Sequence, residues 1–378
     1  MKSLQYIVFI SLLFIKVSAQ VPTAQKLDPS MAIEEVSVDS IIWLDPRNEP
    51  IKIVGFEWMQ QDNVYRRLPL HPQWPIRDAV SQLADHTAGG QMRFQTDSKK
   101  IVLKVELGEE SGMYHMAPTG QSGFDLYMQT ADGQRYLKTV RFDARDTIYQ
   151  AEILDADEGK MQEYTINFPL YNGVKSVFLG IEGGATIKEA KPFSFPGKIV
   201  IYGTSITQGG CVSRPGMVFS NILSRKLDAQ FVNLGFSGNG RGEPELAHLI
   251  NQISDVSLII LDYEANANET IQESLGPFVD ILREKHPGTP ILIMSKIRYS
   301  LATERYQLLI DNRDFQQDLV NERKKHGDDN IYFLDGTQVL GDDYFECTVD
   351  GGHPTDLGSY RIAEALLVKI KEILKAKY

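Results

Sequence analysis

Ser205 is the residue with the clearest potential for chemistry. It stands in the segment Gly203-Thr204-Ser205-Ile206-Thr207-Gln208-Gly209, directly after the apolar run 198–202. The run predicts a buried strand, and ligands of open parallel sheets bind beyond the carboxyl ends of the strands. A serine hydroxyl is a weak nucleophile and needs a neighbouring general base. Taken alone, the segment is equally compatible with a structural turn.

A suitable base lies near the other end of the chain, in the segment Asp350-Gly351-Gly352-His353-Pro354. Aspartate and histidine three residues apart can share one loop, so that the carboxylate bonds one imidazole nitrogen and the other faces Ser205. We therefore predict Ser205 as nucleophile, His353 as general base and Asp350 as the orienting carboxylate. The other histidines lack such a neighbourhood and are interpreted as surface or structural residues; they are His71, His86, His115, His248, His286 and His326.

Donors for an oxyanion are available after two further predicted strands. The segment 233–240 is rich in glycine and can expose backbone N–H groups, and the segment 262–268 offers asparagine amides. Preorganised donors of this kind stabilise the tetrahedral intermediate of acyl transfer. Four strand ends together would supply nucleophile, N–H donor, amide donor and base, a combination more specific than any single motif.

These segments resemble the conserved blocks of the SGNH (GDSL-type) hydrolases, a family of esterases and lipases on a flavodoxin-like sheet. The first block resembles 203–209, with Thr204 where aspartate is usual, and the last matches Asp350, His353 and Pro354. The resemblance implies the triad Ser205, His353 and Asp350. It also implies an oxyanion hole made of the N–H groups of Ser205 and Gly238 and the side chain of Asn266.

The third block departs from the family pattern. Glu264 replaces the usual glycine and Ala267 the usual aspartate, so Asn268 is the alternative to Asn266. The segment Gly123-Phe124-Asp125-Leu126-Tyr127 resembles the motif that names the N-terminal β domain of a bacterial subgroup of this family. The combined resemblance spans nearly the whole chain after the N-terminal segment.

The predicted fold is α/β with a preceding β domain. Segments between 41 and 187 are short and strand-like, with a hairpin turn at Asp132-Gly133 and a strand at 136–142, which is typical of a sandwich or jelly roll. Beyond the linker-like segment 192–197, apolar strands alternate with helical patterns, including a helix with Pro277 in its first turn. This alternation predicts a three-layer domain with a parallel sheet.

We divide the chain into a signal peptide (1–19), a β-sandwich domain (20–192) and a hydrolase domain (193–378). Lys2, the apolar run 6–15 and the small residues 17–19 form a signal-peptide pattern, which predicts export to the periplasm or the extracellular space. No second apolar stretch approaches the length of a membrane span.

Two cysteines and two polar residues near the predicted site allow alternative interpretations. Cys211 and Cys347 could form a disulfide between the nucleophile and base loops, or remain two buried thiols. Arg214 could contact substrate or form an ion pair, and Asn239 could contact substrate. No cluster has the spacing of a metal site, and no cofactor is expected.

Composition limits the class of partner. A net charge of −11 argues against a nucleic-acid-binding protein, and 378 residues suffice for two domains. The favoured function is hydrolysis of carboxylic esters by an acyl-enzyme mechanism, with short acyl groups such as acetate on carbohydrate as substrate. The alternatives are a lipid or thioester hydrolase, and a carbohydrate-binding protein with a vestigial hydrolase domain. The sequence does not specify an oligomeric state.

Overall fold

The computed structural model of the protein describes residues 40–299 and 306–375. The expected signal peptide, residues 1–19, lies outside the described residues. Among the helices of the described ranges, none combines the length and the apolar character needed to cross a membrane.

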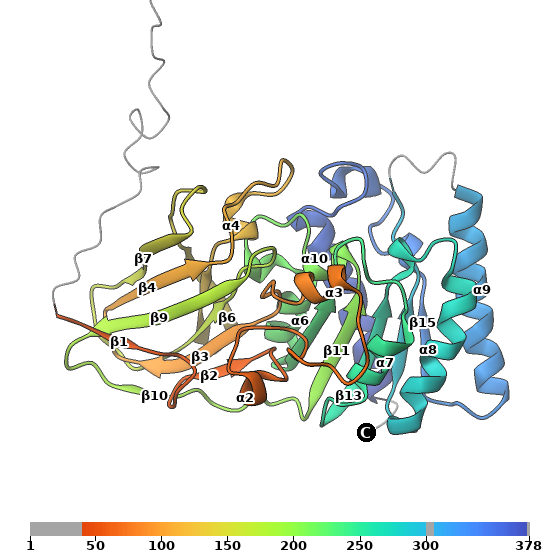
Figure 1. The fold of residues 1–378 in the computed structure, drawn as a ribbon, viewed down its shortest axis with the longest axis horizontal. Helices are drawn as coiled ribbons and strands as arrows, with labels where there is room; N and C mark the ends of the chain where they lie inside the picture. The colour runs from red at the N-terminus through yellow and green to blue at the C-terminus, as the bar shows by residue number, and fades with distance from the viewer. Residues whose placement is uncertain (1–39, 300–305, 376–378) are drawn as a thin grey trace, which may run out of the picture. The chain divides into compact units, whose positions relative to one another are not determined.

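The first half of the described chain forms two antiparallel sheets (Figure 1). One sheet has the order β1 (Ile41–Leu44), β9 (Val174–Glu182), β4 (Lys100–Leu107), β7 (Ile148–Asp155). The other has the order β10 (Ile187–Glu189), β3 (Gln91–Thr96), β8 (Gln162–Asn167), β5 (Asp125–Thr130), β6 (Gly133–Thr139), and β2 (Lys52–Val54) pairs with β3.

Alternating side chains of these two sheets form one apolar core. Leu103 and Val105 of β4 pack in the same cluster as Met92 and Phe94 of β3. This arrangement follows from the two-residue period of a strand, which sends alternate side chains to one face. It confirms the predicted β domain. The predicted strand 136–142 is displaced, because β6 begins at Gly133, directly after the two-residue turn that joins it to β5.

The second half contains a five-stranded parallel sheet. Its order is β12 (Gln230–Gly235), β11 (Lys198–Gly203), β13 (Val256–Asp262), β14 (Ile291–Met294), β15 (Ile331–Leu334), and every pair is parallel. This is the flavodoxin-like order. In β11, Val200 and Tyr202 join one apolar cluster and Ile199 and Ile201 join another, so the strand is buried on both faces.

Helices cover both faces of this sheet and complete the three layers (Figure 1). One cluster includes side chains of α7 (Pro244–Ile250), α8 (Ile271–Lys285) and α9 (Tyr306–Lys325). The other includes side chains of α6 (Phe219–Leu227) and α10 (Asp356–Lys375). The predicted three-layer α/β architecture is therefore confirmed. Short helices α2 (Met59–Asp62), α3 (Asp78–Leu83), α4 (Pro118–Gln121) and α5 (Ser205–Gln208) occupy connections.

Two helices differ from the sequence interpretation. Pro277 lies inside α8 rather than in its first turn, because Ile271 and Leu275 extend the buried face of the helix towards its N-terminus. Helix α9 was not predicted. It has only two buried apolar side chains, Leu309 and Val320, so the sequence shows no strong apolar period there.

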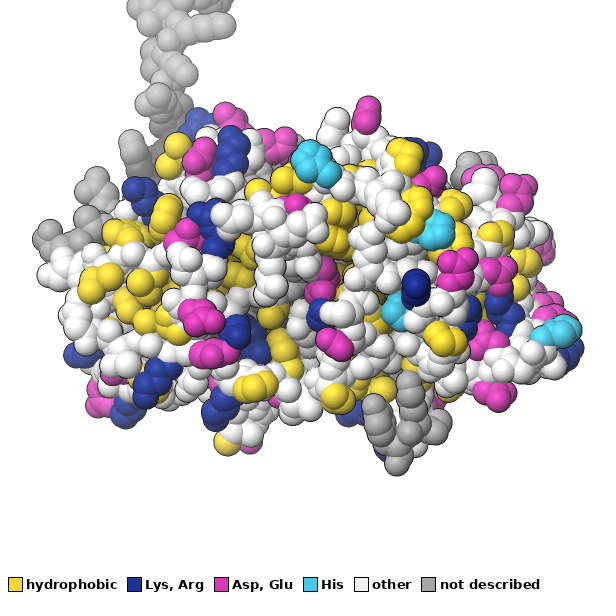
Figure 2. Space-filling model, turned by 60° about the horizontal axis from the view of Figure 1, so that its bottom comes forward, with side chains coloured by type: hydrophobic (Ala, Val, Ile, Leu, Met, Phe, Trp, Pro, Cys, Tyr) yellow, Lys and Arg dark blue, Asp and Glu magenta, His cyan; other side chains and the backbone are white. Residues whose placement is uncertain are grey.

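Charged side chains of both signs are interspersed on the face of the molecule shown in Figure 2. A mixed surface of this kind is ordinary for a globular protein with excess acidic residues. That face therefore shows no continuous band of Lys and Arg side chains that could follow a nucleic-acid backbone.

The connection between β2 and β3 packs against the parallel sheet, although it belongs to the first half of the sequence. Trp58, Leu68 and Val80 are buried in the same cluster as Tyr202 of β11. Arg67 is fully buried, and its guanidinium donates to backbone oxygens of both halves: His86 (2.6 Å), Leu83 (2.6 Å) and Gly235 (2.5 Å). The predicted boundary at 192/193 falls between β10 and β11, but the two halves share one core across it.

Burial lowers the pKa of Arg67 to about 9, so the side chain remains charged near neutral pH. We expect Arg67→Met to lower the free energy of unfolding by about 3–5 kcal/mol, because buried carbonyl groups lose a charged donor. Arg47→Met, which removes a surface ion pair with Asp45, should cost about 1 kcal/mol or less. Urea denaturation of both variants measures the difference, and equal losses would contradict the assigned role of Arg67.

Candidate active site

Ser205 begins the short helix α5, one residue beyond the turn that ends β11. The Thr204 hydroxyl accepts a hydrogen bond from Ile206 N–H (3.3 Å), and the Thr207 hydroxyl accepts one from Thr204 N–H (3.2 Å). Gly203 is required here, because a Cβ atom would lie 2.6 Å from the backbone oxygen of Asp262. The capped turn therefore presents the serine at the carboxyl end of the sheet in a fixed orientation.

Ser205, His353 and Asp350 are brought together in one hydrogen-bonded chain. Ser205 Oγ lies 2.9 Å from His353 Nε2, and His353 Nδ1 lies 2.8 Å from Asp350 Oδ2. Ser205 is buried, whereas about a third of the His353 side chain (33%) is exposed. This is the geometry in which an imidazole can take the serine proton while the carboxylate fixes its tautomer.

The environment of Asp350 keeps its carboxyl group ionised. Partial burial alone would raise its pKa, but hydrogen bonds from His353 N–H, the His353 ring and Gly352 N–H outweigh burial and lower the pKa to about 2. The backbone bonds measure 2.7 Å from His353 and 3.0 Å from Gly352. A carboxylate held by several donors stays ionised and can accept the hydrogen bond at His353 Nδ1.

Backbone contacts hold the serine and histidine loops against each other. Cys211 N–H donates to the carbonyl of Pro354 (2.9 Å), the residue after His353. Ser213 adds two bonds to the Asp356 carboxylate, from its N–H (2.8 Å) and its hydroxyl (2.5 Å). The distance between Ser205 and His353 is thus fixed by a network outside the reacting groups.

The turn after β12 contains the predicted N–H donor Gly238. The neighbouring N–H groups are used within the fold: Ser237 donates to Gln208 Oε1 (3.0 Å), and Asn239 and Gly240 donate to Phe236 O (each 2.9 Å). Gly238 has a positive φ of 67°, which favours glycine. Its N–H has no acceptor among the described residues, as an oxyanion donor requires.

The two candidate asparagines after β13 have different surroundings. The Asn268 amide is committed at both ends, since it donates to Ala265 O (3.0 Å) and accepts from Lys296 Nζ (2.8 Å). No hydrogen bond commits the Asn266 side chain among the described residues, and its Oδ1 is buried. Asn266 therefore remains the better candidate for the amide donor.

Glu264, which stands at the family's glycine position, has a structural environment. Its Oε2 accepts hydrogen bonds from Lys296 N–H (2.6 Å) and from Gln316 Nε2 (2.7 Å) of α9. Burial raises its pKa, although these bonds oppose the increase. The departure from the family block is thus accommodated by a contact with a helix that covers the sheet.

Arg214 and the Gly123–Tyr127 motif form one contact between the two halves of the described chain. Arg214 Nη1 donates to Asp125 Oδ2 (2.9 Å) and to the Tyr127 hydroxyl, and Gly216 N–H donates to the same carboxylate oxygen (2.8 Å). Asp125 is fully buried, and burial raises its pKa while Arg214 opposes the increase. Arg214 thus forms the ion pair that was one of its two interpretations, and substrate contact stays a prediction.

Asn239 is also engaged within the protein. Its Oδ1 accepts from Arg77 Nη1 (2.7 Å) and its Nδ2 donates to Ser237 O (2.8 Å). It lines a cavity of about 550 Å³ together with His86 and Tyr171. Substrate contact through its side chain would have to replace one of these bonds.

His115 is expected from the sequence to lie away from the catalytic residues, but the structure brings it beside His353. Its ring stands edge-on to the His353 ring, with centroids 5.4 Å apart, and its Nε2 lies 3.9 Å from Asp350 Oδ2. Tyr114 stacks on it at 4.2 Å and is 88% exposed. Sequence spacing gave no sign of this, because His115 comes from the β4–β5 connection of the other half of the chain.

Cys211 and Cys347 are free thiols in the structure, contrary to the possible disulfide. They belong to different apolar clusters: Cys347 packs under α10, whereas Cys211 packs beside Met116 and Leu170. Burial, assisted by Asp350, raises the pKa of the Cys211 thiol to about 12. Although no sequence spacing indicates a metal site, the fold brings ligand atoms of His115, Cys211 and His353 within 4.8 Å of one another.

A second histidine, His86, is connected through Gln208 to the turn after β12 that contains Gly238. Gln208 Nε2 donates to His86 Nδ1 (3.0 Å), and Gln208 Oε1 accepts from Ser237 N–H. Tyr171 adds a hydrogen bond from its hydroxyl to Ser205 O (3.0 Å). His86 and Tyr171 both belong to the first half of the sequence, which therefore braces the site directly.

Comparison with protein families shows which family the chain resembles in each half. Residues 197–371 match the GDSL-like lipase/acylhydrolase family, and residues 41–187 match the N-terminus of SGNH-hydrolase-type esterases. The two matches together cover most of the sequence. The chain belongs to this family of GDSL-like hydrolases, which makes it an ester-bond hydrolase.

Solved structures show the same architecture. A protein described as a GDSL-like lipase from Bacteroides ovatus is 29% identical, with a TM-score of 0.81 over 89% of this chain and 98% of its own. The salicylyl-acyltransferase SsfX3 from a tetracycline biosynthetic pathway is 20% identical (TM-score 0.74; 89% and 98% covered). An acetyl xylan esterase from Butyrivibrio proteoclasticus is 12% identical (TM-score 0.58; 88% and 99% covered). No curated protein sequence gave a significant match.

The His86 contact predicts a dependence of stability on pH. Burial, with a smaller effect of Arg67, lowers the His86 pKa from 6.5 to about 4. As pH falls from about 6.5 to about 4, the unfolded chain binds a proton that the folded protein excludes, so the free energy of unfolding should fall by about 2–3 kcal/mol.

His86→Gln removes this titration and should flatten the decline between pH 6.5 and pH 4, as measured by urea denaturation at several pH values. His326→Gln, at an exposed position, should leave the slope unchanged. The assignment fails if both variants keep the slope of the unmodified protein.

Proposed function

We propose that this protein is an exported serine esterase that removes short acyl groups, such as acetyl, from carbohydrate. The observation that carries the proposal is the hydrogen-bonded chain from Ser205 Oγ through the His353 ring to Asp350 Oδ2. This arrangement, at the carboxyl end of the parallel sheet, supports Ser205 as the nucleophile, His353 as the general base and Asp350 as the fixed anion.

In the first half-reaction, Ser205 Oγ attacks the ester carbonyl carbon while His353 Nε2 takes the hydroxyl proton. The resulting imidazolium is stabilised by Asp350, whose carboxyl group is ionised with a pKa of about 2. His353 then returns the proton to the leaving alcohol, and the acyl group remains on Ser205. Water repeats the sequence in the second half-reaction and releases the carboxylic acid.

The oxyanion that forms in both half-reactions needs donors already in place. The N–H of Ser205 lies at the start of α5, where a helix leaves its first N–H groups unpaired. The N–H of Gly238 and the amide of Asn266 are the further donors, since neither is committed to another group among the described residues. These three groups come from three strand ends.

The choice of carbohydrate rests on the aromatic pair beside the base. Tyr114 is 88% exposed and stacks on His115, and the His115 ring in turn lies beside His353, so an exposed aromatic ring is one side chain away from the base. An apolar ring face with polar groups around it suits a sugar ring, which has C–H faces and a rim of hydroxyls. Among proteins that share the fold are an acetyl xylan esterase and family two carbohydrate esterases.

Export rests on the signal-peptide pattern of residues 1–19. An exported location would give the enzyme access to polysaccharide outside the cytoplasm. Detection of the cleaved protein in a periplasmic or culture fraction tests this part independently of activity.

The proposed chemistry predicts a graded loss of activity. Ser205→Ala should lower kcat on acetylated oligosaccharides and aryl acetates by several orders of magnitude. Asn266→Ala should lower kcat by about 10²–10³-fold with a smaller change in KM, because the amide acts on the oxyanion. Equal turnover by Ser205→Ala and the unmodified protein would refute the mechanism.

The proposed substrate class predicts a selective effect at Tyr114. Tyr114→Ala should raise KM for acetylated oligosaccharides while leaving kcat/KM for a small aryl acetate nearly unchanged, because only the sugar uses the aromatic face. Tyr360→Ala, at an exposed tyrosine of α10, is the matched control. A parallel loss on both substrates would indicate a structural role for Tyr114 instead.

A further inference from the structure

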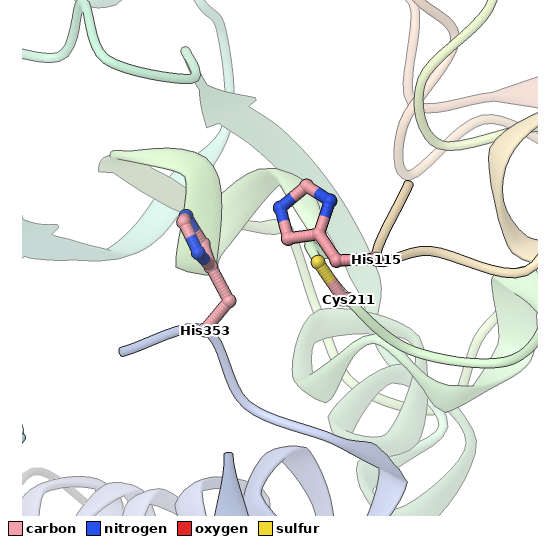
Figure 3. A group of neighbouring side chains, drawn as sticks. All are labelled: His115, Cys211 and His353. Carbon is pink, nitrogen blue, oxygen red and sulfur yellow. The ribbon is translucent and has the colours of Figure 1, made fainter. Parts of the chain in front are cut away.

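Three chain segments that are distant in sequence bring nitrogen and sulfur ligands to one point beside the catalytic base. His115 comes from the β4–β5 connection, Cys211 from the loop after α5, and His353 from the loop before α10. Their ligand atoms lie within 4.8 Å of one another, and Figure 3 shows both imidazole rings and the sulfur converging on the same space.

Two of the three ligands are uncommitted. The His115 ring forms no hydrogen bond with the described residues, and its Nδ1 is buried without a partner. The Cys211 thiol is free and 8% exposed. A cation could therefore recruit both groups without breaking a hydrogen bond between described residues.

The third ligand, His353, is hydrogen-bonded at both ring nitrogens. Its Nδ1 contacts Asp350 Oδ2 at 2.8 Å, and its Nε2 contacts Ser205 Oγ. Carboxylate–histidine pairs of this kind orient ligands in zinc proteins and increase their basicity. The cost is the contact with Ser205 Oγ (2.9 Å), which a cation on Nε2 would replace.

We propose that His115, Cys211 and His353 form a Zn²⁺ site that inhibits the esterase. On binding, the Cys211 thiol releases its proton to solvent and bonds the metal as a thiolate, and each imidazole contributes a nitrogen lone pair. Ser205 Oγ loses its base and cannot be deprotonated by His353. The metal site stands on its own geometry, whereas the inhibitory consequence rests on the proposed esterase function.

The ligand set selects the metal. One thiolate and two imidazoles suit Zn²⁺, with bond lengths of about 2.0–2.3 Å, and three protein ligands leave a fourth position for water. Tetrahedral bonds of this length require the ligand atoms to approach one another by about 1 Å from the 4.8 Å limit. Mg²⁺ and Ca²⁺ prefer oxygen ligands and should not bind here.

The first test measures Zn²⁺ binding to the full chain by titration calorimetry, together with the absorption of the Co²⁺ form. We expect one Zn²⁺ per chain and a thiolate-to-cobalt charge-transfer band. Cys211→Ala and His115→Ala should each weaken Zn²⁺ binding about tenfold or more, and Cys211→Ala should abolish the band. Cys347→Ala is the matched control, because it removes the other free thiol. It should change neither the affinity for Zn²⁺ nor the charge-transfer band.

The second test measures hydrolysis of an aryl acetate with Zn²⁺, Mg²⁺ or a chelator. Zn²⁺ should inhibit the unmodified protein and Cys347→Ala, the chelator should restore activity, and Cys211→Ala should need about tenfold more Zn²⁺ for the same inhibition. Mg²⁺ should have no effect.

The inference is overturned if Zn²⁺ does not bind, or if Cys211→Ala binds Zn²⁺ as tightly as the unmodified protein. Ser205→Ala separates this inference from the proposed function, since it should bind Zn²⁺ with unchanged stoichiometry although it is inactive. A further outcome separates the two proposals. If Zn²⁺ binds with the expected pattern among the variants, but the protein without metal hydrolyses no ester, the metal site is upheld and the esterase function is refuted.

Discussion

The geometry of the site depends on one short contact between two loops, the hydrogen bond from Cys211 N–H to Pro354 O at 2.9 Å. Parallel strands deliver Ser205 and the segment before His353 to the same edge of the sheet, but a sheet edge alone fixes positions only to within several ångströms. A hydrogen bond between the two backbones, flanked by the bonds of Ser213 to Asp356, brings Ser205 Oγ and His353 Nε2 to 2.9 Å. Catalytic groups act efficiently only when such distances are held.

The first half of the chain contributes to this constraint from outside the parallel sheet. Asp125 pairs with Arg214 in the loop after α5, and Arg67 binds a carbonyl group at the end of β12. His86 and Tyr171 then contact α5 itself, through Gln208 and Ser205 O. Because these residues are hydrogen-bonded to the second half of the chain, and Asp125, Arg67 and Tyr171 are buried, the β domain braces the candidate active site.

Much of the architecture could be predicted from sequence because it follows from strong local patterns. Buried parallel strands are short apolar runs, and Ser205, Asp350 and His353 lie in loops whose spacing and glycine content are distinctive. The confirmed fold class depends on these patterns. Helix α9 escaped prediction because it has little apolar periodicity, and Pro277 was misplaced because the buried face of α8 extends beyond it.

The contacts between the two halves could not be predicted. His115 lies beside His353 only because a connection of the β domain folds onto the parallel sheet. For the same reason Arg67 is buried against Gly235, at the end of β12. No periodicity encodes such long-range packing, and a single histidine or arginine carries no local signal. The same reason explains why the disulfide hypothesis is not met: Cys211 approaches Pro354, while Cys347 is buried in a separate cluster under α10.

The central claim is that His353 and Asp350 activate Ser205 as a nucleophile, and covalent labelling tests it most directly. The protein would be incubated with a fluorophosphonate ester, which phosphonylates activated serines, and then digested for peptide mass spectrometry. We predict one phosphonyl group per chain, located on Ser205, and much slower labelling of His353→Ala. Labelling of a different residue, or continued ester hydrolysis with Ser205 unlabelled, would contradict the account.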